Sequence, residues 1–242
     1  MKNRSSSRKG GFTLLETVIA IGVLAVLLTG FMYVFGPAAE GIKKAINIQQ
    51  ADRLVSTLEL ELVTLRGDAE QSTYKTGFNK AFELIKGSNT AGTAVLVYQY
   101  RGDLTKTRAD GTPEPMAKSA GKLPGQGYTL QTMARLRTDP NFIDSGNGDI
   151  TAIEGVVYYV KCTQLIFKNG ELAIGSPGQI ADPKTGTEAA TSDAYPEAVI
   201  AFNADFYALE NRSASTLDAA LTNQFAKTGK KPIFSRNLAV RR

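Results

Sequence analysis

Few residues of this chain can do chemistry, because its 242 residues include no histidine. Without histidine, Ser-His-Asp and Cys-His nucleophile systems and histidine-based zinc sites are excluded. The single cysteine, Cys162, lies in the apolar run VVYYVKCTQLIF and cannot form an internal disulfide. We expect a half-buried strand thiol rather than a reactive one, because apolar surroundings keep a thiol protonated.

Two groups of oxygen-bearing side chains remain. Asp144, Asn147 and Asp149 lie in the glycine-rich stretch DSGNGD and offer the oxygen ligands that calcium prefers. Their spacing does not match an EF-hand loop, and turn chemistry explains the same residues, so they are weak calcium candidates and we expect no cofactor. The carboxylates of Asp193 and Glu197 do not define a convergent site, and we expect no enzymatic activity.

The most informative side chain is Glu16, the only charged residue between Phe12 and Phe35. This segment forms about 36 Å of helix, enough to cross a hydrocarbon core of about 30 Å. A carboxylate in a spanning helix costs about 2.5–3.5 kcal/mol at the bilayer centre and less near its edge. Glu16 lies close to the start of the segment, so either it reaches back to the headgroups or a partner charge compensates it.

The basic residues are concentrated before the apolar segment. Four basic residues lie before Phe12, and without them the formal charge of the chain falls from +5 to +1, which argues against a nucleic-acid partner. Later basic pairs, such as Arg135 with Arg137, are interpreted as solvated surface. The positive-inside rule places the N-terminus in the cytoplasm and the rest of the chain across the membrane. The four residues are Lys2, Arg4, Arg8 and Lys9.

Two ordinary targeting segments are alternatives. A secretory signal has an apolar core of about 7–15 residues before a small-x-small cleavage site. The core here is longer, although Gly36-Pro37-Ala38 loosely resembles such a site. An uncleaved signal anchor is the second alternative. Neither explains Glu16.

Residues 9–16, KGGFTLLE, followed by the apolar run, resemble the class III leader of type IV pilins and type II secretion pseudopilins. The resemblance implies that a prepilin peptidase cuts between Gly11 and Phe12 and methylates Phe12. Glu16 then matches the family acid that neutralises the N-terminal amine of an adjacent subunit during assembly. The implied partners are this peptidase, other pilin subunits and the inner-membrane assembly platform.

The apolar run is followed by an amphipathic helical pattern, with acids such as Asp52, Glu59 and Glu61 off its apolar stripe. We expect this half of the helix to pack on its own globular domain. The stripe consists of Ile48, Ala51, Val55, Leu58, Leu62 and Leu65. Between the two halves, Gly36 and Pro37 predict a hinge at residues 36–41, by a kink or local melting, because Pro37 cannot donate to the Tyr33 carbonyl.

The remainder of the chain reads as mixed helix and strand. Long loops are expected at 102–127 and 175–194, and Lys168-Asn169-Gly170-Glu171 indicates a hairpin turn. The expected helices are 78–87 and a segment opened by a capping box at Ser215 and ending near Gly229. The expected strands are 93–102, 128–137, 153–172 (two strands joined by the turn), 196–209 and 233–240.

The pilin resemblance implies an α+β fold, with a long N-terminal helix, transmembrane in its first half, packed on a mainly antiparallel β-sheet. The expected segments are a leader (1–11), an assembly helix (12–35), its amphipathic continuation (36–66) and a head domain (67–242). The interpretation is a minor or specialised subunit of a type IV pilus-like filament. It is expected to move from the bacterial inner membrane, with its head periplasmic, to the pilus surface. The alternatives are a type II secretion or DNA-uptake pseudopilin, or a binding module displayed on a pilus.

Overall fold

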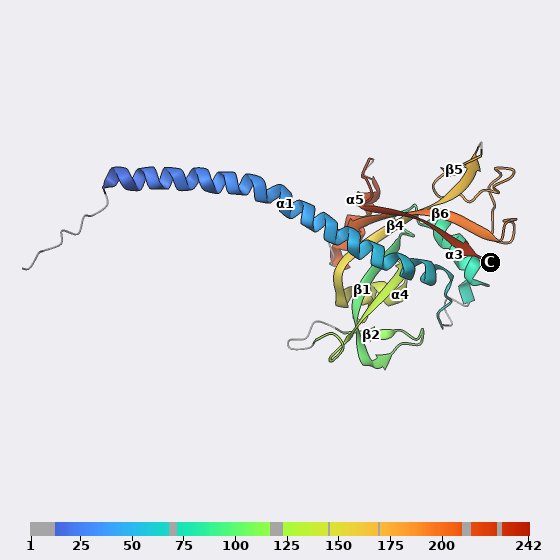
Figure 1. Cartoon of the computed structure of the whole chain (residues 1–242). Coiled ribbons are helices and arrows are strands. Elements are labelled where there is room, and N and C mark those ends of the chain that lie inside the picture. Colours follow the sequence, from blue (N-terminus) through green and yellow to red (C-terminus); the bar gives the residue numbers. More distant parts are fainter. Residues whose placement is uncertain are drawn as a thin grey trace, which may run out of the picture. The chain divides into compact units, whose positions relative to one another are not determined.

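The computed structural model describes residues 13–67, 72–116, 123–144, 146–168, 170–209, 214–226 and 229–242. The chain divides into two units, residues 1–46 and 47–242. Helix α1 (Leu14–Val63) begins in the first unit and ends in the second (Figure 1). The second unit thus begins inside the helix, because the C-terminal part of α1 supplies buried side chains to its core.

The second unit is built on one antiparallel sheet with the order β2-β1-β4-β6-β7, in which β3 also pairs with β1 and β5 with β4. Every ladder is antiparallel, as expected. The strands are β1 (Val95–Thr107), β2 (Pro113–Pro115), β3 (Thr129–Leu136), β4 (Ile153–Lys168), β5 (Glu171–Ile174), β6 (Val199–Leu209) and β7 (Phe234–Arg241).

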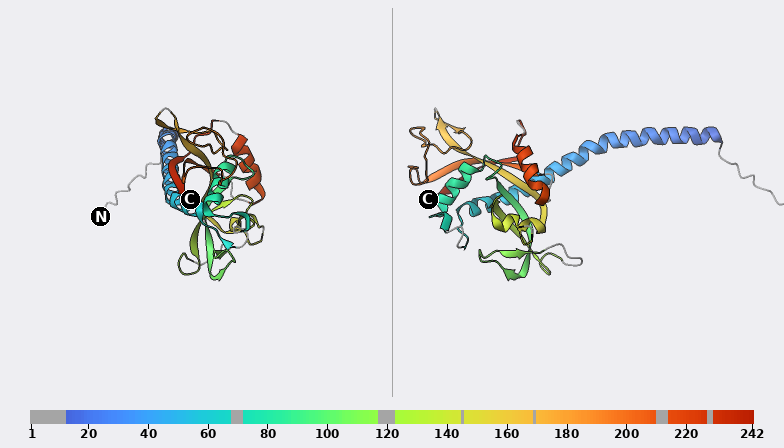
Figure 2. Two further views of the ribbon diagram at one scale, coloured as in Figure 1. Left: turned by 90° about the vertical axis from the view of Figure 1, so that its right-hand side faces the viewer. Right: turned by 180° about the vertical axis from the view of Figure 1, so that it is seen from behind.

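Each face of the sheet is buried against different helices, which Figure 2 shows from two further directions. The first face packs on α1 and on α3 (Gly77–Gly87), and loop residues such as Ile180 and Tyr195 complete that core. The second face packs on α4 (Pro140–Ile143), the 3₁₀ helix η1 (Asp149–Ala152) and α5 (Ala214–Ala226). The α+β fold expected from the pilin resemblance is therefore confirmed.

The buried stripe of α1 follows the expected helical spacing, with one addition and one correction. Leu54 joins Ala51, Val55, Leu58 and Leu62 in the core. Glu61, expected off the stripe, is only 4% exposed. Arg66 makes this burial possible, because its guanidinium donates two hydrogen bonds to the Glu61 carboxylate.

The prediction of a loop at residues 102–127 was only partly correct. Strand β1 continues to Thr107, and β2 pairs back onto it. The predicted hairpin is confirmed, because Lys168 pairs with Glu171 and Gly170 has a positive φ of 84°. Residues 175–194 form an irregular loop with an isolated bridge between Ala181 and Glu188, as expected. The capping-box side chains at Ser215 and Asp218 lie outside the described residues.

Candidate functional site

The N-terminal end of α1 is capped by Thr13. The Thr13 hydroxyl accepts a hydrogen bond from the backbone N–H of Glu16 at 3.3 Å. The spacing Thr13-x-x-Glu16 is that of a capping box, in which the acid can also reach back to the N-cap backbone. This local role was missed in the sequence analysis, although the spacing indicates it.

The Glu16 carboxylate has no hydrogen bond or ion pair among the described residues, and its side chain is exposed. A carboxylate on an otherwise apolar helix surface can therefore accept a cation or an N–H donor from outside this part of the chain. Gly11 and Phe12, the predicted cleavage and methylation sites, lie outside the described residues.

The first part of α1 presents an apolar surface that no described residue of its own unit covers. Side chains from Leu14 to Phe35 are exposed, among them Val26 at 73% and Met32 at 68%. By length and composition, α1 is the one helix of the described chain that could cross a membrane. An exposed apolar helix of this kind is stable when lipid or other apolar helices cover it.

Helix α1 continues without interruption through Gly36 and Pro37. The local melting that was one of the two expected forms of the hinge at residues 36–41 is therefore not present in this helix. A bend without loss of helix remains a prediction for these residues, because Pro37 still lacks the N–H that would bond to the Tyr33 carbonyl.

The globular unit contains a buried charge cluster centred on Asp149, whose side chain is fully buried. Its carboxylate accepts hydrogen bonds from the Tyr98 hydroxyl at 2.6 Å, from Arg108 at 2.6 Å and from Arg135 at 3.2 Å. Buried carboxylates are stable when paired and hydrogen-bonded, as here. The cluster joins β1, β3 and η1 to the segment that follows β1.

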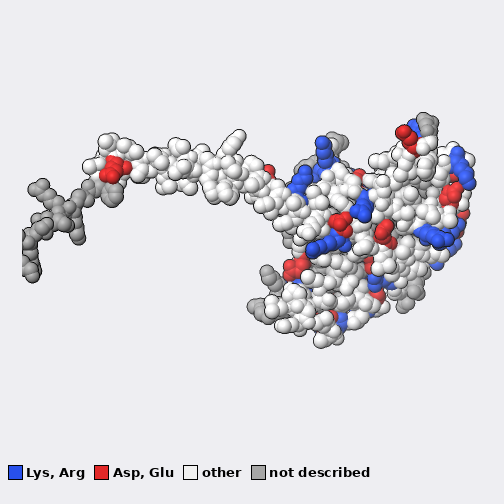
Figure 3. All heavy atoms as spheres, in the orientation of Figure 1, with Lys and Arg blue, Asp and Glu red and all other residues white. Residues whose placement is uncertain are grey.

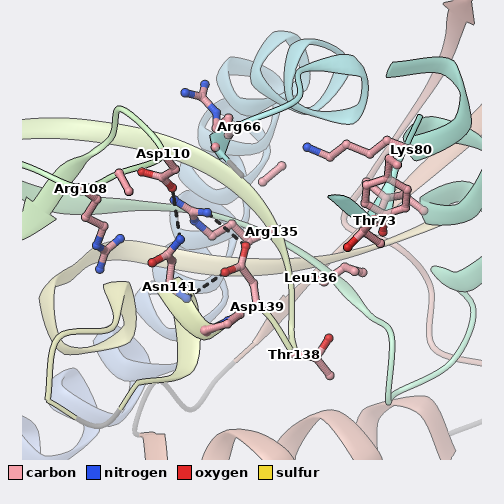
Figure 4. A pocket seen from close by; sticks show the side chains of 16 residues that line it. Arg66, Thr73, Lys80, Arg108, Asp110, Arg135, Leu136, Thr138, Asp139 and Asn141 are labelled. Atoms are coloured by element: carbon pink, nitrogen blue, oxygen red, sulfur yellow. Dashed lines mark hydrogen bonds and ion pairs between the residues drawn. The ribbon is translucent and has the colours of Figure 1, made fainter. Parts of the chain in front are cut away.

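Arg135 connects this cluster to two further acids. Its guanidinium contacts Asp110 at 2.7 Å and Asp139 at 3.1 Å, and Figure 4 shows it between them. The interpretation of Arg135 as solvated surface was wrong, because the side chain is only 3% exposed. Met133 and Arg135 are two residues apart, so both side chains lie on the same face of β3, and both are buried. This spacing along the strand was a sequence signal for the burial of Arg135.

Burial acts in the same direction on both acids of the cluster, but their pKa values shift in different directions. It raises the pKa of the Asp149 carboxyl above its ordinary value, although Tyr98, Arg135 and Arg108 favour the ionised form. Burial acts upward on Asp110 as well, but hydrogen bonds from Thr112 and Arg135 outweigh it, and the Asp110 pKa is lowered.

A cavity of about 490 Å³ adjoins this cluster (Figure 4). Its charged lining includes Lys80, Arg108, Asp110, Arg135 and Asp139. Arg135 is held by carboxylates, and the Lys80 ammonium donates to the Thr64 carbonyl. The charged groups of the lining are engaged with the protein itself, so the arrangement is structural rather than that of a poised acid–base pair.

The calcium candidates have other partners. Asp149 is neutralised by two arginines, the Asp144 side chain accepts from the backbone N–H of Gly146, and the backbone carbonyl of Asn147 accepts from Arg108. Among the described residues, no group of three or more acids or cysteines could hold a metal ion.

The other two candidates have local roles. Glu197 pairs with Lys184 at 3.0 Å, and Asp193 is exposed. Cys162 is 1% exposed, and burial raises the pKa of its thiol to about 12. This environment agrees with the expected unreactive strand thiol. The side chain of Cys162 is more buried than the half-buried position that was predicted.

Comparison with known proteins gives one result. The model of the prokaryotic N-terminal methylation motif matches residues 6–32. No curated protein and no solved structure matches the chain. The motif covers the predicted cleavage site, Glu16 and most of the apolar segment, and it points to a structural, non-enzymatic protein. With the long apolar helix and the antiparallel sheet, it supports a type IV pilin-like or pseudopilin protein.

Proposed function

We propose that the chain is a structural subunit of a type IV pilus-like filament. Prepilin peptidase cuts after Gly11 and methylates Phe12 in the inner membrane, with the globular unit in the periplasm. The mature chain then joins other pilin subunits through the apolar half of α1. Glu16 compensates the N-terminal amine of the neighbouring subunit.

The observation that carries this proposal is the apolar surface of α1, because the most apolar stretch of the helix has no buried residue. In a membrane, lipid covers this surface. In a filament, the helices of neighbouring subunits cover it, so the same side chains serve the anchored and the assembled form. The methylation motif over the same residues supports this use.

The charge on Glu16 supplies register. Two opposite charges about 4 Å apart attract by about 1 kcal/mol in water and several times more in a medium of low dielectric constant. A carboxylate left unpaired among packed apolar helices is penalised, whereas one next to a neighbour's amine is not. The pairing therefore favours one stagger of adjacent helices over the others.

The test separates this role from helix capping. In a capping box, glutamine can replace glutamate, so Glu16→Gln keeps the cap and removes the charge. We expect both Glu16→Ala and Glu16→Gln to lose filament incorporation, measured as the subunit in sheared filaments relative to the membrane. Thr13→Ala, which removes the cap hydroxyl and keeps the charge, is the matched control and should still assemble. Normal assembly of Glu16→Gln would show that the charge is not needed.

A further inference from the structure

The second face of the sheet is covered by a helix over only part of its area. Helix α5 packs Leu217 and Leu221 onto the core of this face. Near the C-terminal end of α5, Phe225 contacts Tyr159 with a ring-centroid distance of 5.1 Å. Among the described residues, the buried core of this face includes Val157 and Tyr159 of β4 and no residue of the β4–β5 hairpin.

The strand register places an apolar patch on this open area. In the β4–β5 ladder, Phe167 pairs with Leu172 and Leu165 pairs with Ile174, so all four side chains share one face. Along β4, every second side chain lies on the same face, so Leu165 lies on the same face as Tyr159. Because Tyr159 belongs to the core that α5 covers, this is the α5 face of the sheet.

Three of these four side chains are exposed although they are large and apolar, whereas Leu165 is only 8% exposed. Phe167 is 68%, Leu172 is 50% and Ile174 is 64% exposed. On the neighbouring strand β6, Asn203 pairs with Thr163, which is two residues before Leu165 and therefore on the same face. Val199 is four residues before Asn203, so it lies on this face too, and it is 43% exposed. We call Phe167, Leu172, Ile174 and Val199 the hairpin patch. Strand β5 lies at the periphery of the globular unit (Figure 1).

We propose that the hairpin patch is a contact surface between the globular units of neighbouring copies of this chain. This inference rests on the proposed function, because the neighbour is brought close by the bundling of the α1 helices. It adds a second contact, made by the sheet, to the one made by the helix.

The size of the patch favours a second copy over a soluble partner. Four partly exposed side chains of this kind offer roughly 300–400 Å² of apolar surface, since a whole aromatic side chain buries about 150–250 Å². A stable pair of proteins that meet in solution buries about 800 Å² on each side. The hairpin patch is too small to hold a freely diffusing partner, but a copy already held alongside acts at a high effective concentration, of the order of millimolar.

The charges at the tip of the hairpin argue against lipid as the occupant. Lys168 and the exposed Glu171 lie opposite each other in the strand register, directly beyond the patch. Insertion of the tip into a bilayer would carry both charges into the membrane, where charged groups are penalised. At a protein contact they remain at a solvated rim, which is their usual place.

The test compares two sets of exposed apolar residues in the full chain, expressed in its native cells. The triple variant Phe167→Ser/Leu172→Ser/Ile174→Ser removes the patch, and Leu104→Ser/Leu123→Ser is the matched control, because these leucines are 56% and 59% exposed elsewhere. We expect the triple variant to reduce filament incorporation by about tenfold, equivalent to the loss of one modest contact, with the same amount of folded protein in the membrane. The control should change it less than about twofold.

A cross-link identifies the occupant. Leu172→Cys in assembled filaments, treated with a reagent that joins a thiol to a lysine, should give a dimer of this chain by mass spectrometry. Cys162 is buried and serves as an internal unreactive site. A cross-link to a different protein, or vesicle flotation of the purified protein that is lost in the triple variant, would overturn the proposal.

The outcomes also separate the two proposals. If Glu16→Gln abolishes assembly and the triple variant assembles normally, the hairpin contact is wrong and the pilin function stands. If Glu16→Gln assembles normally as well, the role proposed for the helix fails first.

Discussion

At the scale of single residues, this chain contains two carboxylates in opposite situations. Glu16 is exposed on an apolar helix without a partner in the described chain, whereas Asp149 is fully buried with three donors. The first acid is available for another molecule. The second is already neutralised, and its role is to hold the globular unit together.

Removal of the buried carboxylate should destabilise the globular unit strongly. In Asp149→Ala, Arg108 and Arg135 lose their shared partner at the centre of the cluster. Breaking a buried ion pair by removing one side costs about 3–5 kcal/mol, and we expect a loss of this order in the free energy of unfolding in urea. Glu114→Ala is the control, because that exposed acid only faces Lys106 at 3.9 Å and its loss should change stability by less than about 0.5 kcal/mol. Equal effects of the two substitutions would contradict the role given to the cluster.

The same cluster predicts a loss of stability in acid. Folding lowers the pKa of Asp110. A carboxyl of this kind contributes stability that is present above its unfolded pKa of about 3.9 and is lost as the pH falls through the folded pKa. We therefore expect the unfolding free energy to decrease below about pH 4, and to decrease less steeply in Asp110→Asn.

Urea unfolding of both proteins between pH 2 and pH 6 measures this difference. Burial raises the pKa of Asp149, which gives the opposite pH dependence, but this carboxyl is present in both proteins. To first order its contribution cancels in the comparison. Parallel pH profiles for the two proteins would show that Asp110 is not the group responsible.

At the scale of elements, local patterns predicted most helices and strands, and tertiary pairing decided the rest. The β4–β5 hairpin follows from its turn residues, and the α1 stripe follows from helical spacing. The extension of β1 to Thr107 and the burial of Arg135 depend on partners distant in sequence, β2 and Asp149. A single sequence does not show which residues those partners are.

A bulge in β4 is an element feature that can be tested. The β1–β4 ladder shifts register between Val97 and Gln99, and on β4 the shift includes Gly155 with φ +74°. An added Cβ would meet nothing within 4 Å, so only the backbone conformation opposes a side chain. We expect Gly155→Ala to lower the unfolding free energy by about 1–2 kcal/mol, and Gly155→Asn to lower it less, because asparagine tolerates positive φ better. Gly92→Ala, also without a close neighbour but without a positive φ, is the control.

At the scale of the whole molecule, the apolar helix and the globular unit place different demands on their surroundings. The helix exposes apolar side chains, and the visible face of the globular unit carries interspersed acids and bases without a patch of one sign (Figure 3). This distribution suits a protein whose helix is enclosed by lipid or other helices while its head faces water.

In the proposed function, processing of the leader connects the anchored and the assembled form, and the two adjacent glycines allow a controlled test. Gly10 and Gly11 are the same residue type at adjacent positions, and only Gly11 is next to the proposed cut. We expect Gly11→Val to retain the leader, because a branched side chain next to the scissile bond restricts the backbone that must enter the peptidase. Intact mass measurement should then find residues 1–11 in this variant and methylated Phe12 at the N-terminus of the unaltered protein.

Gly10→Val should be processed normally and should assemble, whereas Gly11→Val should stay in the membrane with a folded globular unit, because no free amine is available for Glu16. A natural chain that begins at Ala39 would instead show that the apolar segment is an ordinary secretory signal and would remove the basis for assembly through α1.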